Sequence, residues 1–425
     1  MAGIAGVNRK QLASERESLQ QRYDAFKSKG LALDMTRGKP CAEQLDLAID
    51  MLDCLGRDHK SAEGVDCRNY GIVDGLPEAK ELFAELLEIG IDEVIVGGNS
   101  SLNLMHDTVA RAMSHGVVGG DSPWSKLPSV TFVCPVPGYD RHFSICQHFG
   151  IKMVTVPMTD TGPDMNEVEK LVAEDDSVKG IWCVPKYSNP TGVVFSDEVV
   201  DRLAKMKTAA NDFRVFWDNA YAVHDLEDQA VSLKNMLDAC KAANNADRVF
   251  MYCSTSKVSF AGAGVGSMGG STANMDWMRR HLSMQTIGPD KLTQLRHVKY
   301  FKDLGGINTH MKKHAAIIKP KFDAVQEILE KELGGTGVAS WSKPRGGYFV
   351  SLDVLDGCAK AIVAKAAEAG AKLTKAGATF PYGDDPDDRN IRIAPTLPSK
   401  VDIEQATELL AVCVKLVAAE RILGA

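Results

Sequence analysis

The chain has 425 residues, of which 44% are hydrophobic and 25% are charged, as is typical of globular proteins. Its net charge of −7 comes without a basic stripe, which argues against nucleic acid as the main partner. No apolar stretch is long enough to cross a membrane, and the N-terminus turns polar too early for a signal peptide. Ten scattered cysteines without a C-x-x-C pair predict reduced thiols in a cytoplasmic protein.

Short apolar runs alternate with helical patterns between about residues 90 and 270. The runs are rich in β-branched and aromatic residues and are bounded by Gly, Pro, Asn or Asp, which is typical of buried, mainly parallel strands. We therefore expect an α/β sheet domain here, with strands at 93–96, 130–134, 152–156, 180–184, 213–217 and 249–253.

The C-terminal third has a different pattern. Residues 310–333 and 401–423 have long helical periodicity, and they flank predicted strands at 346–352 and 390–394. This predicts a smaller α+β domain. We expect an N-terminal segment, 1–50, that packs with this small domain, then a large domain, 51–310, and the small domain itself, 311–425.

Polar and small residues follow the predicted strands, at the edge of the sheet where open α/β folds bind ligands. Gly97 to Ser101 follows the first strand and opens a helix, which predicts an anion-binding turn. The later strands are followed by Pro-Gly-Tyr139, Asn189-Pro-Thr-Gly192, Asp218-Asn-Ala-Tyr221 and Ser254-Thr-Ser-Lys257. Taken singly, such segments are most often turns, helix caps and solvated lysines. Together they bring an aromatic ring, an amide, a carboxylate and a lysine to one edge.

This set of side chains fits pyridoxal phosphate (PLP), which needs a lysine, a carboxylate for its ring nitrogen and a cradle for its phosphate. The ordered motifs Asn189 to Gly192, Asp218-x-Ala-Tyr221 and Ser254-x-Ser-Lys257 resemble the signature of fold-type I PLP-dependent aminotransferases, class I/II. The resemblance runs from about Tyr70 to Arg392. It implies PLP as the cofactor and a large domain with a mainly parallel seven-stranded sheet flanked by helices, plus a smaller α+β domain.

The resemblance implies a role for each matching residue. Lys257 would form the covalent link with PLP and carry the substrate proton, and Asp218 would pair with the ring nitrogen. Asn189 and Tyr221 would hydrogen-bond the ring 3′-oxygen, and Tyr139 would stack on the ring. The remaining implied cofactor contacts are a phosphate cup of Gly98, Asn99, Ser100, Ser254 and Ser256, and Tyr70 lent to the neighbouring subunit of a homodimer with shared active sites.

The same resemblance implies the substrate contacts. Arg392 would bind the α-carboxylate, although a surface arginine is the competing interpretation and Arg389 lies close by. Gly38 belongs to a loop that would close over the substrate, and Asn189 would contact the substrate as well. The candidates for a second, side-chain carboxylate are Arg37 and Arg345.

One feature departs from the family pattern. The loop after the lysine, Ala263-Gly264-Val265-Gly266, lacks the arginine that most relatives use to bind the phosphate, and we expect its glycines to leave room for that group. A helix N-terminus, the serine hydroxyls, an imported cation or Lys291 could replace the arginine. In this departure the chain resembles an atypical bacterial subgroup of the family. That subgroup includes aspartate aminotransferases and is similar to the aminotransferase-like domain of MocR-type regulators.

The leading hypothesis is therefore a cytoplasmic aminotransferase that exchanges an amino group between aspartate and 2-oxoglutarate by a ping-pong mechanism. A β-lyase or decarboxylase on the same scaffold would share almost all of these residues, although Arg392 favours retention of the carboxylate. A non-catalytic PLP-binding sensor domain is the third alternative. Partners are expected to be small-molecule amino acids and 2-oxo acids, without nucleic acid, membrane or metal.

Overall fold

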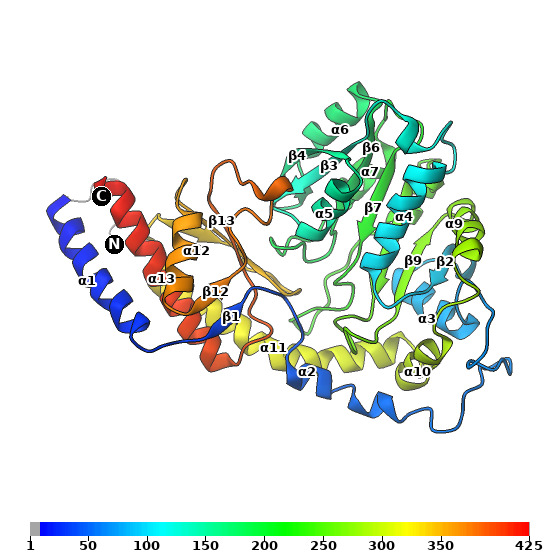
Figure 1. The fold of residues 1–425 in the computed structure, drawn as a ribbon, viewed down its shortest axis with the longest axis horizontal. Coiled ribbons are helices and arrows are strands. Elements are labelled where there is room, and N and C mark those ends of the chain that lie inside the picture. The colour runs from blue at the N-terminus through cyan, green and yellow to red at the C-terminus, as the bar shows by residue number, and fades with distance from the viewer. Residues whose placement is uncertain (1–8, 425) are drawn as a thin grey trace.

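The computed structural model describes residues 9–424. Figure 1 shows two units, an α/β unit around a large twisted sheet and a smaller α+β unit that holds both described chain ends. The long helix α11 (Leu304–Leu333) runs from one unit to the other. The domain boundaries expected at residues 50 and 310 remain a prediction.

The large unit is organised by one eight-stranded sheet. Across the sheet its strands are β2 (Val94–Val96), β9 (Gly266–Gly270), β8 (Val249–Ser254), β7 (Arg214–Asp218), β6 (Val178–Cys183), β3 (Thr131–Val136), β4 (Lys152–Thr159) and β5 (Gly162–Pro163). Strands β8, β7, β6, β3 and β4 are mutually parallel, whereas β9 is antiparallel to both of its neighbours. The six predicted strands are all present. The sheet has eight strands rather than seven because the two-residue β5 adds a short antiparallel edge.

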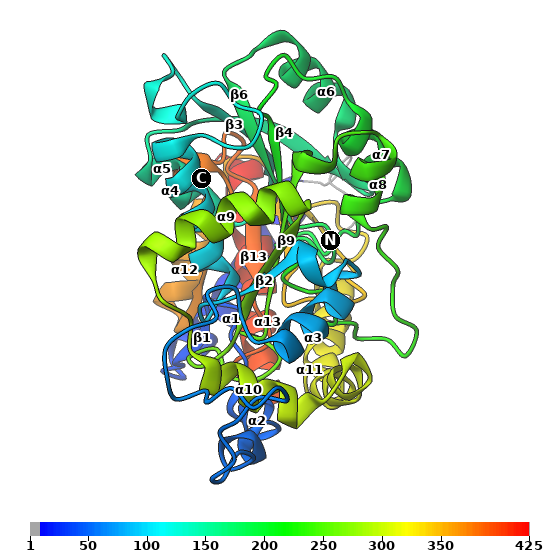
Figure 2. The same ribbon diagram turned by 90° about the vertical axis from the view of Figure 1, so that its right-hand side faces the viewer.

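Helices cover both faces of this sheet. They are α3 (Pro77–Leu87), α4 (Ser101–His115), α5 (Asp140–His148), α6 (Met165–Glu174), α7 (Asp197–Lys205), α8 (Met236–Ala242), α9 (Thr272–Gln285) and α10 (Lys291–Phe301). Side chains of α3, α6, α7 and α8 pack on one face, and those of α4, α5 and α9 on the other. In Figure 2, α3 and α9 lie on opposite sides of β2 and β9. The central strands are therefore buried on both faces, which is why β6, β7 and β8 are rich in apolar residues, whereas the strand β4 near the edge is partly exposed.

The strands alternate their side chains between the two layers. Val215 and Trp217 of β7 belong to one hydrophobic cluster, and Phe216 between them belongs to the other. Many helices begin at a polar residue whose side chain accepts a hydrogen bond from a first-turn amide, as Ser196 does for α7 and Asp290 for α10. At these helices a capping residue marks where the helix starts.

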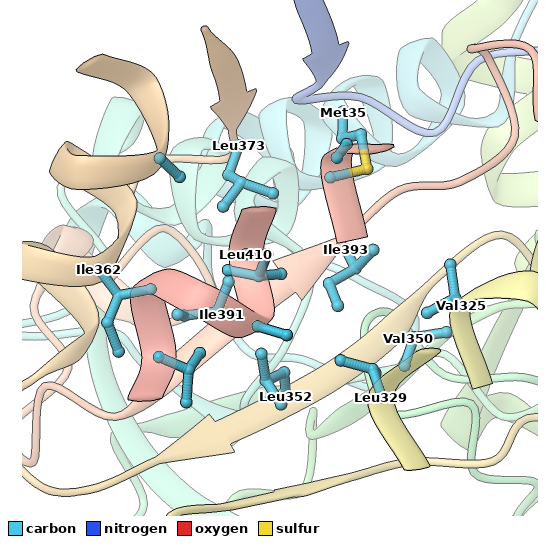
Figure 3. Packing of buried hydrophobic residues seen from close by; sticks show 14 of the residues in the cluster. Met35, Val325, Leu329, Val350, Leu352, Ile362, Leu373, Ile391, Ile393 and Leu410 are labelled. Carbon is cyan, nitrogen blue, oxygen red and sulfur yellow. The ribbon is translucent and has the colours of Figure 1, made fainter. Parts of the chain in front are cut away.

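The small unit combines two short sheets with long helices. Strands β10 (Ala339–Trp341), β11 (Val350–Val354) and β13 (Asn390–Ile393) form an antiparallel sheet, and β1 (Leu33–Met35) pairs in parallel with β12 (Ala371–Leu373). Helix α1 (Arg9–Lys27) packs against α13 (Lys400–Leu423), and α12 (Ala359–Glu368) packs on α13 as well. Figure 3 shows Leu352, Ile391 and Leu410 from three of these elements directed into one core.

Helix α11 belongs to the cores of both units. Ile307 and Met311 in its first half pack with residues of the large unit, and Val325 and Leu329 in its second half pack in the small unit. Pro320 lies inside the helix between these two halves. The remaining short elements are the helix α2 (Ala42–Asp46) and 3₁₀ turns at Ile49–Leu52, Ile91–Glu93, Trp124–Lys126, Ala246–Arg248 and Pro381–Gly383.

Candidate active site

A cavity of about 410 Å³ lies between the carboxyl ends of the parallel strands and the small unit. Its wall brings together eight residues singled out from the sequence, which are Arg37, Gly38, Tyr139, Asn189, Asp218, Tyr221, Lys257 and Arg392. They come from the N-terminal segment, four strand ends of the large sheet and strand β13. Segments distant in sequence therefore converge at the edge of the sheet where ligands were expected.

Asp218 ends strand β7 and is 1% exposed at the cavity wall. The Nε2 atom of His142 lies 3.0 Å from Asp218 Oδ2 and donates a hydrogen bond to it. The other carboxylate oxygen, Oδ1, is buried and has no partner among the described residues. An unpaired buried acceptor is costly, so this oxygen fits a ligand that brings a proton.

His142 is a site residue that the sequence interpretation missed. Its ring stacks on Trp182 at 4.3 Å between centroids and 11° between planes, and it meets the edge of Tyr139 at 4.9 Å. These contacts fix the imidazole that orients Asp218. The sequence feature that could have indicated His142 is its spacing, since it lies in the first turn of α5, three residues after Tyr139.

Lys257 lies in the turn that follows strand β8 and points at aromatic side chains. Its Nζ lies 4.9 Å from the ring centroid of Tyr221 and 5.9 Å from that of Tyr348. Burial lowers the pKa of Lys257, and the carboxylate of Asp218 opposes this shift. Burial also raises the pKa of the Tyr221 hydroxyl well above its usual value. Lys257 is therefore closer to a neutral, reactive amine than a surface lysine would be.

Arg392 connects the small unit to the sheet edge. Its Nη1 donates to Asn189 Oδ1 at 3.2 Å and to Asp140 Oδ1 at 3.0 Å. The guanidinium also stacks over the ring of Phe349, 4.9 Å from the centroid. No hydrogen bond joins Nη2 to another residue within 9–424, so this edge of the fork remains for a ligand. Arg392 is thus a buried cavity residue rather than a surface arginine.

The predicted phosphate residues lie beside the lysine turn but are not part of the cavity wall. Gly266 N donates to Gly98 O at 3.0 Å, and Gly97 N donates to Gly266 O at 2.9 Å. A Cβ on Gly266 would lie 2.8 Å from the main chain of Ser100, and one on Gly264 would lie 3.3 Å from Asn99 O. These two glycines therefore permit close main-chain packing, rather than the open space that the sequence interpretation assigned to them.

The turn at Asn99 and Ser100 leads directly into α4. Ser100 is the N-cap residue of α4, yet its side chain accepts no hydrogen bond from the first turn and instead donates to Asn103 Oδ1 at 2.8 Å. Across the strand edge, Ser254 Oγ donates to Ser256 Oγ at 3.1 Å. The first amides of α4 thus keep their capacity to bind an anion.

Three predicted residues lie away from the cavity. Tyr70 is 80% exposed. Arg345 is also exposed, forms an ion pair with Glu227 at 2.7 Å and is not part of this cavity wall. Lys291 is buried and donates to the carbonyl of Gly71 at 2.9 Å, an interaction that holds the segment next to Tyr70.

The cavity also contains basic residues that the sequence interpretation did not select. Lys39, Arg141 and Lys375 line it beside Arg37, and all four side chains are exposed. Lys39 and Arg141 are direct or near neighbours of predicted site residues, whereas Lys375 is on a loop after β12 and gave no signal. One wall of the cavity is therefore strongly cationic.

The sequence profile described as "Aspartate amino-transferase" matches residues 7–425 of the chain. The chain belongs to this family. It is an aminotransferase of PLP fold type I, so the predicted family, fold and enzyme class are confirmed.

Two relatives resemble this aminotransferase over nearly its whole length. An aspartate aminotransferase of Corynebacterium glutamicum is 46% identical over 405 residues, 95% of this chain and 94% of the relative. A Mycolicibacterium smegmatis protein, provisionally named an aminotransferase, is 49% identical over 421 residues, 98% of each chain.

Solved structures show the same fold. The crystal structure of an aspartate transaminase from Corynebacterium glutamicum superimposes with a TM-score of 0.96 at 45% identity, covering 98% of each chain. An α-aminoadipate aminotransferase from Thermus thermophilus, complexed with N-(5′-phosphopyridoxyl)-L-leucine, has a TM-score of 0.75 at 18% identity, covering 93% of this chain and 95% of its own. The second likeness supports the fold alone. Within residues 9–424, no helix has the length and apolar character needed to span a bilayer.

Proposed function

We propose that this aminotransferase transfers the amino group of aspartate to 2-oxoglutarate in two half-reactions at one site, a ping-pong mechanism. A relative 46% identical that is named aspartate aminotransferase supports the choice of aspartate. The observation that carries the proposal is the arrangement around one cavity of the Lys257 amine, the unpaired Asp218 Oδ1 and the Arg392 guanidinium.

The residues present fit PLP. The buried Oδ1 of Asp218 suits the protonated ring nitrogen, the uncapped first turn of α4 suits the phosphate, and Lys257 supplies the amine. Tyr139, Asn189 and Tyr221 are the cavity residues that would hold the ring. When bound, PLP supplies a sink for the electron pair released at the substrate Cα.

Lys257 is the proton carrier in this proposal. Because burial lowers its pKa, its amine can be neutral, and a neutral amine can take the proton from the substrate Cα and return it at a neighbouring atom. The turn after β8 holds this amine beside the rings of Tyr221 and Tyr348, 4.9 and 5.9 Å from their centroids. His142 holds Asp218 in the orientation that presents Oδ1 to the cavity.

Arg392 and the cationic wall select the substrate. Arg392 would bind the α-carboxylate through the free edge of its guanidinium while Asn189 and Asp140 hold the other edge. On the cationic wall, Arg37 would bind the second carboxylate, and Gly38 beside it lets the loop pack on Phe349. A wall with several cations favours a substrate with two negative charges over one with a single charge.

The proposal is tested by following the visible absorbance of the purified, PLP-loaded protein. Aspartate alone should convert the aldehyde form of the cofactor to the amine form, and 2-oxoglutarate should then restore the original spectrum. A panel of other amino acids serves as the comparison. A spectrum that responds to another amino acid but not to aspartate or glutamate would refute the substrate assignment.

We also propose a cytoplasmic homodimer with shared active sites. Tyr70 is 80% exposed, and it shares the surface with the apolar residues Met284 and Ile287, which are 84% and 61% exposed. All ten cysteines are free thiols, which suits a reducing compartment. Sedimentation of the wild-type protein checks the dimer, and Tyr70→Phe should weaken PLP retention if the hydroxyl reaches a neighbouring phosphate. Monomeric, fully loaded protein would overturn this part of the proposal.

A further inference from the structure

A closed ring of buried hydrogen bonds, called the hydrogen-bonded ring below, lies beside the lysine turn, and its side chains are not part of the cavity wall. Gln44 Nε2 lies 3.0 Å from Tyr348 Oη and 3.0 Å from His314 Nδ1. His314 Nε2 lies 3.0 Å from His310 Nε2, which in turn lies 2.9 Å from Val258 O. Tyr348 Oη makes a long contact of 3.5 Å with Lys257 O, so the main chain of residues 257 and 258 closes the ring.

The four side chains of the ring come from three separate parts of the fold. Gln44 lies on α2, His310 and His314 lie one turn apart on α11, and Tyr348 precedes β11. Their exposed fractions are 0%, 4%, 0% and 1%, respectively. Buried polar groups carry a high energetic cost unless they are bonded, so this ring constrains the relative positions of the segments that it joins.

The ring is also connected to the substrate side of the cavity. Gln44 follows the cavity loop Thr36–Lys39 closely in sequence, and its Oε1 accepts from Cys41 N at 3.2 Å. At Gly38, an added Cβ would lie 2.5 Å from the ring of Phe349, the residue next to Tyr348. The loop is therefore linked to the hydrogen-bonded ring through two segments, the chain from Cys41 to Gln44 and the neighbouring pair Tyr348 and Phe349.

The protons of the ring cannot satisfy all of its contacts at once. Burial lowers the pKa of His314 to about 3 and also lowers that of His310, so both imidazoles are neutral. Val258 O can only accept, which requires the proton of His310 on Nε2. A hydrogen bond from Gln44 Nε2 to His314 Nδ1 requires the proton of His314 on Nε2. That proton then points at His310 Nε2, which already carries a proton. One of the three bonds must yield, so the protons of the hydrogen-bonded ring have alternative arrangements, and the Val258 carbonyl loses its donor only when His310 carries its proton on Nδ1.

We propose that Gln44, His310, His314 and Tyr348 are positioning residues for Lys257, and that they make the place of its amine depend on the loop Thr36–Lys39. This inference rests on the proposed role of Lys257. The ring touches the lysine only through main-chain carbonyls and the face of the Tyr348 ring. Loss of these hydrogen bonds should therefore displace the Lys257 amine without removing any group that contacts substrate.

The test uses the PLP-loaded enzyme and two variants that remove hydrogen bonds at nearly constant shape, Tyr348→Phe and Gln44→Met. We expect each to lower the single-turnover rate constant with saturating aspartate about tenfold, because small displacements of a reacting group are costly. The apparent dissociation constant of aspartate should change less than about twofold, since binding groups are untouched. The visible circular dichroism of the bound cofactor should also weaken.

The matched control is Tyr23→Phe. Tyr23 is a buried tyrosine of the small unit whose hydroxyl donates to Lys365 O at 3.0 Å, far from the lysine turn. It should lower the melting temperature as much as Tyr348→Phe and leave the rate constant and circular dichroism unchanged. Because the ring acts as one unit, the Gln44→Met and Tyr348→Phe double variant should be no slower than the slower single variant.

Rates for Tyr348→Phe equal to those of the Tyr23→Phe control would overturn the inference, as would losses that multiply in the double variant. If Gln44→Met does not fold, the comparison of the two tyrosine variants decides. If the wild-type enzyme does not react with aspartate, the proposed substrate fails instead. In that event the circular dichroism comparison, which needs only bound PLP, still decides on the ring.

Discussion

The imidazole of His142 donates a hydrogen bond to one oxygen of Asp218 and leaves the other oxygen buried and unpaired at the cavity wall. The first oxygen is committed to the protein, and the second is available to a ligand. The two oxygens of Asp218 therefore have different roles, because Oδ2 is bonded to His142 and Oδ1 faces the cavity.

Replacing His142 with Phe should keep the stacking on Trp182 but lose the bond to Asp218. We expect the single-turnover rate to fall about tenfold, with Asp218→Asn falling about a hundredfold or more because it removes the charge itself. Stopped-flow absorbance with aspartate measures both. Equal rates for His142→Phe and the wild-type protein would show that Asp218 needs no orientation by His142.

Replacing Lys257 with Ala should abolish the absorbance of the lysine-bound cofactor, since the covalent link has no other amine at that position. Lys375→Ala is the matched control, because Lys375 is another lysine of the same cavity wall. Its spectrum should match that of the wild-type protein. Visible spectra of the purified, PLP-loaded variants decide, and an unchanged spectrum for Lys257→Ala would rule out this lysine.

Replacing Arg392 with Ala should weaken the binding of the amino acid about tenfold or more, because a charge-assisted hydrogen bond to the carboxylate is lost. PLP binding should stay nearly intact. Arg389→Ala is the control, since Arg389 is half-buried outside the cavity wall and its side chain pairs with Asp356 at 3.8 Å. Titration of each variant with aspartate measures the effect. Loss of cofactor instead of substrate would move Arg392 out of the substrate role.

Replacing Arg37 with Ala should lower kcat/KM for aspartate about tenfold and leave that for alanine nearly constant, because only aspartate carries the second carboxylate. The control is Arg345→Ala, whose side chain pairs with Glu227 outside the cavity. Steady-state assays with both amino acids give the ratio. A parallel loss for both substrates would mean that Arg37 acts on the loop rather than on the distal carboxylate.

Acid should destabilise the fold through its buried histidines. Burial lowers the pKa of His297 to about 4 and of His314 to about 3, so the unfolded chain binds more protons than the folded one below about pH 6.5. Stability is then present above that pH and falls as the pH drops, by up to about 1.4 kcal/mol per histidine and pH unit. Urea unfolding at several pH values measures the slope, and His297→Asn should reduce it; an unchanged slope would contradict this origin.

The sequence predicted the residues that line the cavity better than the residues that hold them in place. Lys257, Asp218, Asn189 and Tyr221 lie at or just after the carboxyl ends of buried parallel strands, so the topology alone brings them to one edge. His142 could not be found in this way, because its role depends on the packing of α5 against β7 and on the ring of Trp182.

Other features depended on distant packing in the same way. The strand β9 has the sequence Gly-Ser-Met-Gly-Gly, which lacks the β-branched residues that mark a strand, and it was missed; its glycines allow contact with Ser100 and Ile89. Arg345 looked equivalent to Arg37 in sequence, and only the fold separates an exposed ion pair from a cavity wall.

Pro320 has a mechanical consequence for the enzyme. A proline inside a helix removes one main-chain hydrogen bond and crowds the preceding turn, so bending concentrates there. In α11 this weak point falls between the half that carries His310 and His314 and the half that carries Val325 and Leu329. If the small unit moves toward the sheet, we expect α11 to bend at Pro320, so that the half that carries His310 and His314 keeps its place beside the lysine turn.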